Sequence, residues 1–188
     1  MSALARSQNS GTGSVEAYLA WEREQVERHE YIAGEIHAMV GASLAHGRIL
    51  FNLAKALDAA VEPGSCAVFV DGAKLRVGDA VFCPDVMVSC QGFDLKGDLI
   101  GAPVLIAEVL SPSTELHDRG VKWRHYQRLP SRESYVLVAQ DRAMVEVFAR
   151  RDGSWTYASH VGAEERVVLE YPRCTLRVGD LYAGLRPR

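Results

Sequence analysis

Two acidic residues interrupt apolar stretches that are typical of buried strands. Asp85 lies within VFCPDVMV and Glu108 within PVLIAEVLS. Apolar residues at consecutive positions indicate strands that are covered on both faces. A carboxylate there is costly to bury unless a cation, a metal ion or a proton compensates its charge. Each acid alone is equally explained by an arginine partner or by a strand end, but the two together predict a shared site.

A lysine and a tyrosine follow Glu108 at helical spacing. Asp118, Lys122 and Tyr126 recur every four residues, so a helix over 117–128 places them on one face. Two carboxylates can hold a hard divalent cation through oxygen ligands, and Mg²⁺ suits such a site. A lysine beside the ion can position a bound water or help to deprotonate it. This combination suits phosphodiester hydrolysis, whereas the simpler interpretation of Lys122 is an exposed ion pair with Asp118.

The elements that must position these residues begin with a helix and a hairpin. Ser14 is a good helix N-cap, HEYIAGEIHAMVG predicts a hairpin around residues 33–34, and HGRILFNLAKALDAAV has the apolar spacing of an amphipathic helix. The strands CAVFV and AKLRV follow, and Asp71-Gly72 predicts a hairpin turn between them. Pro84 predicts a bulge or a strand edge just before the first of the two acids.

The second half of the chain is rich in strand patterns. The segments predicted as strands are ESYVLVAQ, AMVEVFA, SWTYAS, RVVLE and TLRV. The complete order is a helix, three strands, a helix and a strand, with a hairpin in front and a β-rich extension behind. This order predicts an α/β fold with a mixed sheet.

Two segments before the first acid offer further candidates for the site. Glu30 and Glu35 flank the predicted hairpin turn, where carboxylates are usually solvated edge charges. His46 lies at the start of the amphipathic helix, where a histidine is more often a cap or a surface residue. Its functional interpretation is a phosphate contact at a helix N-terminus.

The composition limits the class of protein. The 188 residues carry a formal net charge of −3 at pH 7, which argues against a broad non-specific nucleic-acid surface but not against a local basic groove. We expect a disordered tail, rich in Ser, Gly and Asn, over residues 1–13 and a single domain over residues 14–188. No stretch is apolar enough for a signal peptide or a membrane span. The cysteines form no CxxC pair and are expected to be free, mostly buried thiols of a cytoplasmic protein: Cys66, Cys83, Cys90 and Cys174.

The two acids and their neighbours resemble a known group of nucleases. Pro84-Asp85 and Glu108-Val109-Leu110, on a helix–three strands–helix–strand core, look like the PD-(D/E)XK superfamily, also called restriction-endonuclease-like. More closely, the sequence resembles the Uma family of endonucleases over roughly residues 14–150. The motifs that carry this resemblance are YIAGEI, His46, PDV, EVLSPST and D-x3-K-x3-Y.

The resemblance implies an endonuclease that hydrolyses DNA with Mg²⁺, or with Mn²⁺ in its place. The implied metal ligands are Asp85, Glu108 and Val109. Leu110 stands where the superfamily pattern has a lysine, so Lys122 on the following helix is the expected replacement. This departure leaves open a catalytically inactive nuclease-fold domain that binds nucleic acid or a protein partner. A glycosidase would also use paired carboxylates, but that chemistry gives no role to Lys122.

The resemblance also implies further site residues and an assembly. Glu35 is the candidate for the upstream acid that the superfamily tends to have, and His46 and Tyr126 are candidates for a phosphate or substrate contact. Two cuts in a duplex need two active sites, so we expect a homodimer, with AMVEVFA as a candidate strand for an isologous contact.

Overall fold

The computed structural model describes residues 13–39, 41–91, 93–131 and 133–185. The tail predicted at residues 1–13 lies outside this range except for its last residue. Within the described residues, no helix combines the length and the apolar character that crossing a membrane requires.

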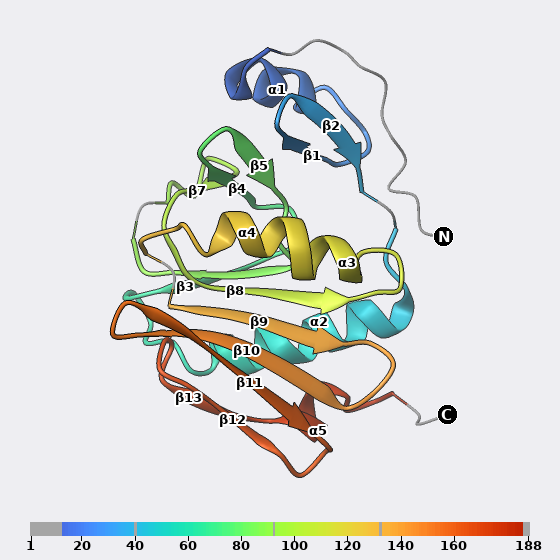
Figure 1. The fold of residues 1–188 in the computed structure, drawn as a ribbon, viewed down its shortest axis with the longest axis vertical. Helices are drawn as coiled ribbons and strands as arrows, with labels where there is room; N and C mark the ends of the chain where they lie inside the picture. The colour runs from blue at the N-terminus through green and yellow to red at the C-terminus, as the bar shows by residue number, and fades with distance from the viewer. Residues whose placement is uncertain (1–12, 40, 92, 132, 186–188) are drawn as a thin grey trace.

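A six-stranded sheet forms the centre of the molecule (Figure 1). Its order is β11-β10-β9-β8-β6-β3. Strands β8 and β9 run parallel, whereas β3–β6, β6–β8, β9–β10 and β10–β11 pair antiparallel. The sheet is therefore mixed, as predicted. The strand bounds are Ala67–Val70 (β3), Val86–Ser89 (β6), Pro103–Leu110 (β8), Ser134–Ala139 (β9), Met144–Arg151 (β10) and Ser154–Val161 (β11).

A smaller sheet carries the N-terminal hairpin. It has five strands in the order β2-β1-β5-β4-β7, and helix α1 (Val15–Glu22), which Ser14 caps as predicted, lies beside it (Figure 1). The predicted hairpin is formed by β1 (His29–Ile32) and β2 (Glu35–Ala38). The remaining strands are β4 (Lys74–Val77), β5 (Ala80–Phe82) and β7 (Leu99–Ile100). A two-stranded sheet of β12 (Arg166–Leu169) and β13 (Cys174–Arg177) precedes helix α5 (Val178–Leu181).

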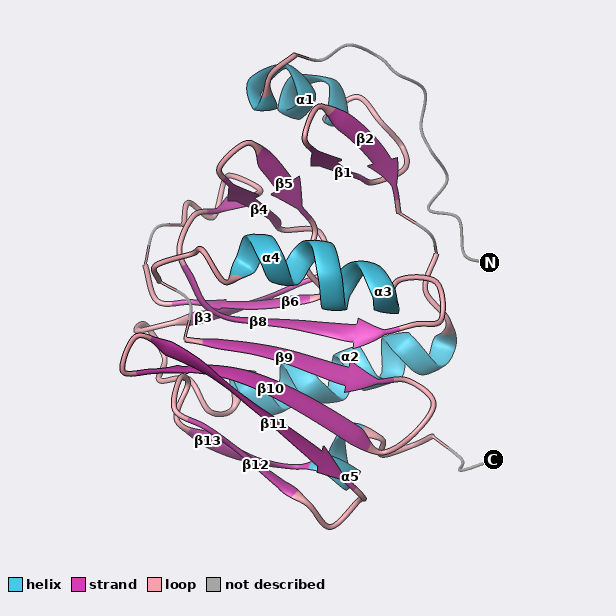
Figure 2. Cartoon of the chain, in the orientation of Figure 1, coloured by secondary structure: helices cyan, strands magenta, loops and turns pink. Residues whose placement is uncertain are grey.

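Helices cover the two faces of the central sheet (Figure 2). Helix α2 (Leu44–Asp58) packs on one face through Ile49, Leu53 and Leu57, which are all buried. The other face is covered by the β8–β9 crossover, which runs through α3 (Glu115–His117), the π-helical turn η1 (Asp118–Lys122) and α4 (Trp123–Tyr126). We call this continuous segment the crossover helix.

Strand β8 alternates between these two faces. Leu105, Ala107 and Val109 belong to the core beneath α2. Ile106 and Leu110 belong to the core beneath the crossover helix, which places Glu108, between them, on the same face. The two-residue alternation of a strand is therefore enough to direct the Glu108 side chain towards the crossover helix.

The predicted hairpin at Asp71-Gly72 is wrong. Strand β3 pairs with β6 and strand β4 pairs with β5, so the turn takes the chain from the central sheet to the smaller sheet. The φ angles of 43° at Asp71 and 119° at Gly72 still fit the predicted tight turn. The sequence therefore predicts the tight turn correctly, but long-range packing decides which strand each of the two strands pairs with.

The stretch VFCPDVMV is two strands instead of one. Strand β5 ends at Phe82 in the smaller sheet, and β6 begins at Val86 in the central sheet. Pro84 has no N–H to donate to a ladder and lies in the gap. The predicted irregularity before Asp85 is thus a change of sheet.

The cysteines and strand β10 correct two further expectations. Cys66 and Cys90 form a disulfide beside the cross-strand pair of β3 and β6, whereas Cys83 and Cys174 are free. Two of the four expected free thiols are therefore oxidised, which weakens the inference of a reducing compartment. Strand β10, which contains AMVEVFA, is paired on both edges by β9 and β11 and cannot provide the predicted strand contact between subunits.

The packing of α2 predicts an asymmetric response to mutation. Leu53→Ala should lower the free energy of unfolding by about 2–5 kcal/mol, because the side chain is fully buried beneath the sheet. Phe51→Ala on the same helix should change it by less than about 1 kcal/mol, because that ring is 56% exposed. Urea denaturation of both variants measures the difference. Equal losses would mean that α2 does not face the sheet as described.

Candidate functional site

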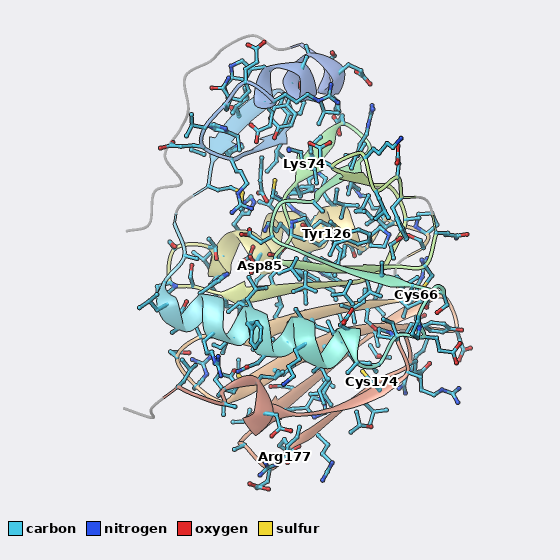
Figure 3. The ribbon with its side chains drawn as sticks, turned by 180° about the vertical axis from the view of Figure 1, so that it is seen from behind. Cys66, Lys74, Asp85, Tyr126, Cys174 and Arg177 are labelled. Carbon is cyan, nitrogen blue, oxygen red and sulfur yellow. A yellow bond between two sulfur atoms is a disulfide. The ribbon has the colours of Figure 1, made fainter. Side chains whose placement is uncertain are left out.

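A cleft of about 400 Å³ opens between the start of α2, the end of β8 and the crossover helix. Its walls contain the predicted acids and the predicted lysine, together with Arg28, Ser43, His46 and Asp118. Figure 3 marks Asp85 in the middle of the molecule, in the layer between α2 and the smaller sheet. The loop that follows β8 adds the hydroxyl residues Ser111, Ser113 and Thr114 to the wall.

Strand pairing brings the two acids side by side. Asp85 directly precedes β6, and the register of β6 and β8 places Val86 opposite Ala107. The main-chain N–H of Asp85 donates to Glu108 Oε2 at 3.3 Å, and the N–H of Val109 donates to Asp85 Oδ2 at 2.7 Å. The side chain of Asp85 is 15% exposed and that of Glu108 is 3% exposed. The pair therefore forms a wall of the cleft with Asp85 nearer to solvent.

Lys122 is buried among carboxylates. Its Nζ lies 2.9 Å from Glu108 Oε1, 3.2 Å from Asp118 Oδ1 and 3.4 Å from Glu30 Oε1. The side chain is 7% exposed, so the exposed ion pair with Asp118 that the sequence allowed is not what the structure has. Tyr126 is fully buried, and its hydroxyl donates to Glu108 Oε1 at 3.3 Å.

The crossover helix contains a π-helical turn that includes Asp118 and Lys122. The crossover helix widens over Asp118–Lys122 before it resumes as α4. Such wide turns leave main-chain groups without their usual helical partners, and they are frequent at functional sites. Here the Tyr135 hydroxyl donates to the main-chain carbonyl of Asp118 at 3.1 Å. Strand β9, which carries Tyr135, thus supports the widened turn from below.

His46 also reaches the acids. It lies in the first turn of α2, where its N–H donates to the Ser43 side chain at 3.1 Å. Its Nε2 is 3.3 Å from Asp85 Oδ1. Burial lowers the pKa of His46, but the hydrogen bond and charge of Asp85 outweigh that effect, so the pKa is raised overall. Within the protein, His46 therefore contacts the carboxylate of Asp85 at the wall of the cleft.

Glu35, the predicted upstream acid, does not lie at the site, and another acid of the same hairpin does. Glu35 has a side chain that is 70% exposed and lies 3.8 Å from His37, outside the cleft. Glu30, expected to be a solvated edge charge, is buried and approaches Lys122 instead. Glu30 faces Cys83, His117 and Lys122, whereas Glu35 begins the edge strand β2. Each strand of the hairpin carries one glutamate, so the sequence does not indicate which of the two is buried.

The site contains more negative than positive groups. Three carboxylates, Glu30, Glu108 and Asp118, contact the Lys122 ammonium, and Asp85 lies beside Glu108. Burial raises the pKa of Glu108 well above its usual value; Lys122 opposes this effect only in part, and the nearby carboxylates add to it. Burial would lower the pKa of Lys122, but Glu108, Glu30 and Asp118 raise it well above its usual value. The lysine therefore holds its proton firmly.

The donor set is compatible with a hard divalent cation. Asp85 and Glu108 offer carboxylate oxygens, and the carbonyl of Val109 is the atom through which that residue could bind an ion. Among the described residues, no three or more His, Cys, Asp or Glu side chains converge into a complete metal site. An ion here would keep several water ligands, which is the usual state of Mg²⁺ in proteins. The carboxylates that raise the pKa of Glu108 also favour such an ion, because a cation can take the place of the proton.

Comparisons with known proteins agree with this geometry. Two uncharacterised proteins of Synechocystis sp. are similar to the chain: one is 35% identical over 92% of each chain, and the other is 31% identical over 82% of this chain and 90% of its own. A solved structure from Anabaena variabilis, titled a "putative nuclease belonging to DUF820", has a TM-score of 0.76 at 18% identity and covers 90% of this chain and 97% of its own. That likeness confirms the nuclease-like mixed α/β fold.

The family assignment rests on most of the sequence. A family model described as "Uma2: Putative restriction endonuclease" matches residues 15–177, which include the whole cleft. The family and the fold both support a nuclease function. The chain therefore belongs to the Uma2 family of restriction-endonuclease-like proteins.

Proposed function

We propose that the protein is a metal-dependent endonuclease that hydrolyses phosphodiester bonds in DNA, with Mg²⁺ as the ion and Mn²⁺ as a substitute. The observation that carries this proposal is the contact of Asp85, Glu108 and Lys122 at the wall of an open cleft. Family membership supports the reaction class, and the donor chemistry supports the metal.

Asp85 and Glu108 hold the ion in this proposal, with the carbonyl of Val109 as a further ligand. When bound, such an ion polarises a phosphate and makes a water more acidic. The protein residues then need to supply fixed positive charge where negative charge develops on the phosphate. Lys122 suits this task, because its raised pKa makes it a poor base but a lasting cation.

Tyr126 and His46 take different roles. Tyr126 is fully buried and hydrogen-bonded to Glu108, so it supports that carboxylate instead of touching substrate. His46 lines the cleft and can donate a hydrogen bond to a phosphate at its mouth. Glu35 has no part in the proposal, because it lies outside the cleft.

A domain that binds nucleic acid without cutting it is the alternative. Leu110, at the position of the superfamily lysine, is buried in the core beneath the crossover helix and contributes no charge. Activity then depends on whether Lys122 replaces that lysine in function.

The decisive variant is Lys122→Ala. It should lower the rate of cleavage of plasmid DNA in Mg²⁺ by about a hundredfold or more, because one fixed positive charge is lost from the transition state. DNA binding should change much less, because the loss concerns the transition state. The measurement is cleavage and binding in parallel, with chelator as the metal-free control.

Lys74→Ala is the matched control. Lys74 is also mostly buried and ion-paired, with Asp98 at 2.9 Å, but it does not line the cleft. It should cleave at the wild-type rate. Cleavage by Lys122→Ala at the wild-type rate would contradict the role of Lys122, and wild-type protein that never cuts with Mg²⁺ or Mn²⁺ would leave the binding domain as the better explanation.

We also propose a homodimer in which β11 replaces β10 as the contact strand. Strand β11 is the last strand of the central sheet and contains no Pro, Lys, Arg, Asp or Glu among its eight residues. Long edge strands without such residues tend to pair with another strand. Ala158→Lys on this edge should therefore convert a dimer into a monomer in light scattering, whereas Val168→Lys on β12 should not. A wild-type monomer at assay concentration would contradict the proposal.

A further inference from the structure

Glu30 is the one carboxylate of the site that comes from the smaller sheet. Its Oε2 lies 2.9 Å from Nε2 of His117, and its Oε1 accepts the main-chain N–H of Cys83 at 3.1 Å. The same Oε1 lies 3.4 Å from Nζ of Lys122. Each oxygen is therefore held by a donor from a different segment of the chain.

Glu30 and His117 lie behind the site, since neither belongs to the wall of the cleft. Their side chains are 6% and 8% exposed. Charges interact more strongly in such an enclosed place than at the surface. Glu30 can therefore act on Lys122 but does not meet a substrate in the cleft.

We propose that Glu30, fixed by His117, is a positioning residue that holds the Lys122 ammonium between three carboxylates. Glu30 and Asp118 attract the ammonium in competition with Glu108, at 3.4 and 3.2 Å against 2.9 Å. The ammonium is then held at a fixed place beside Glu108 and is shared among three carboxylates. The catalytic consequence rests on the proposed nuclease function, whereas the positioning itself does not.

A second buried acid–histidine pair in the same region provides a matched control. Glu22 Oε2 lies 3.0 Å from His29 Nδ1, and Glu22 Oε1 accepts the His29 N–H at 3.0 Å. Glu22 is buried to the same degree as Glu30 but does not contact Lys122. A purely structural role for Glu30 would make Glu22→Gln and Glu30→Gln equivalent.

The first test reports on the lysine directly. Native protein is treated with an amine-acylating reagent, and the rate at each lysine is read by mass spectrometry. Glu30→Gln should raise the rate at Lys122 severalfold relative to Lys74, which keeps its own partner Asp98. Glu22→Gln should leave that ratio at the wild-type value.

His117 supplies a second pair of variants that keeps the test valid if Glu30→Gln does not fold. His117→Ala removes the donor to Glu30 and should raise the acylation of Lys122. His117→Gln retains an N–H donor near the position of Nε2 and should restore the wild-type rate. This rescue distinguishes a positioning hydrogen bond from bulk packing.

The second test measures cleavage of DNA in Mg²⁺. Glu30→Gln should lower kcat about tenfold or more with little change in KM, because a displaced ammonium serves the transition state less well. Glu22→Gln should keep the wild-type kcat. If the wild type does not cleave DNA, the proposed function fails while the acylation rates still decide the positioning.

Three results would overturn the proposal. They are an unchanged Lys122 acylation rate in both Glu30→Gln and His117→Ala, an equal rise in Glu22→Gln, and a wild-type kcat in Glu30→Gln despite faster acylation.

Discussion

The burial of an ammonium group among carboxylates is the constraint on which the rest of this site depends. Removing Lys122 from water costs several kcal/mol, and close partners are needed to recover that energy. Three carboxylates lie within 3.4 Å of its Nζ. They hold the lysine charged, while burial and the neighbouring carboxylates raise the pKa of Glu108. A divalent cation at Asp85 and Glu108 would take the place of the proton that this raised pKa favours, so the stability of the cluster and its proposed chemistry depend on the same electrostatic interactions.

Three features of the fold bring these charges together. The chain changes sheets at Pro84, which places Asp85 at the boundary between the two sheets and beside Glu108. The alternation of β8 directs Glu108 towards the crossover helix. The π-helical turn then presents Asp118 and Lys122 to that face. The sheet change and the π-helical turn are irregular, and irregular backbone is common where side chains must be aimed at a site.

Much of this arrangement could be predicted from the sequence, because it follows from local periodicity. The alternation around Glu108, the apolar stripe of α2 and the four-residue spacing that leads to Tyr126 are all short-range patterns. Glu30 and Glu35 show the limit of such patterns. Both flank the same hairpin turn, and the choice between them depends on which strand pairs with β5. That pairing is made by residues some fifty positions away.

The most direct measurement of the central claim is the melting temperature of the protein with and without millimolar Mn²⁺ or Mg²⁺. An ion that binds the folded state alone must stabilise it. The account predicts a rise in melting temperature for the wild type, no rise for Asp85→Asn, and a wild-type rise for Asp98→Asn, whose carboxylate lies outside the cleft. The account would be contradicted if neither ion changed the melting temperature of the wild type, or if the ions raised that of Asp85→Asn as much as that of the wild type.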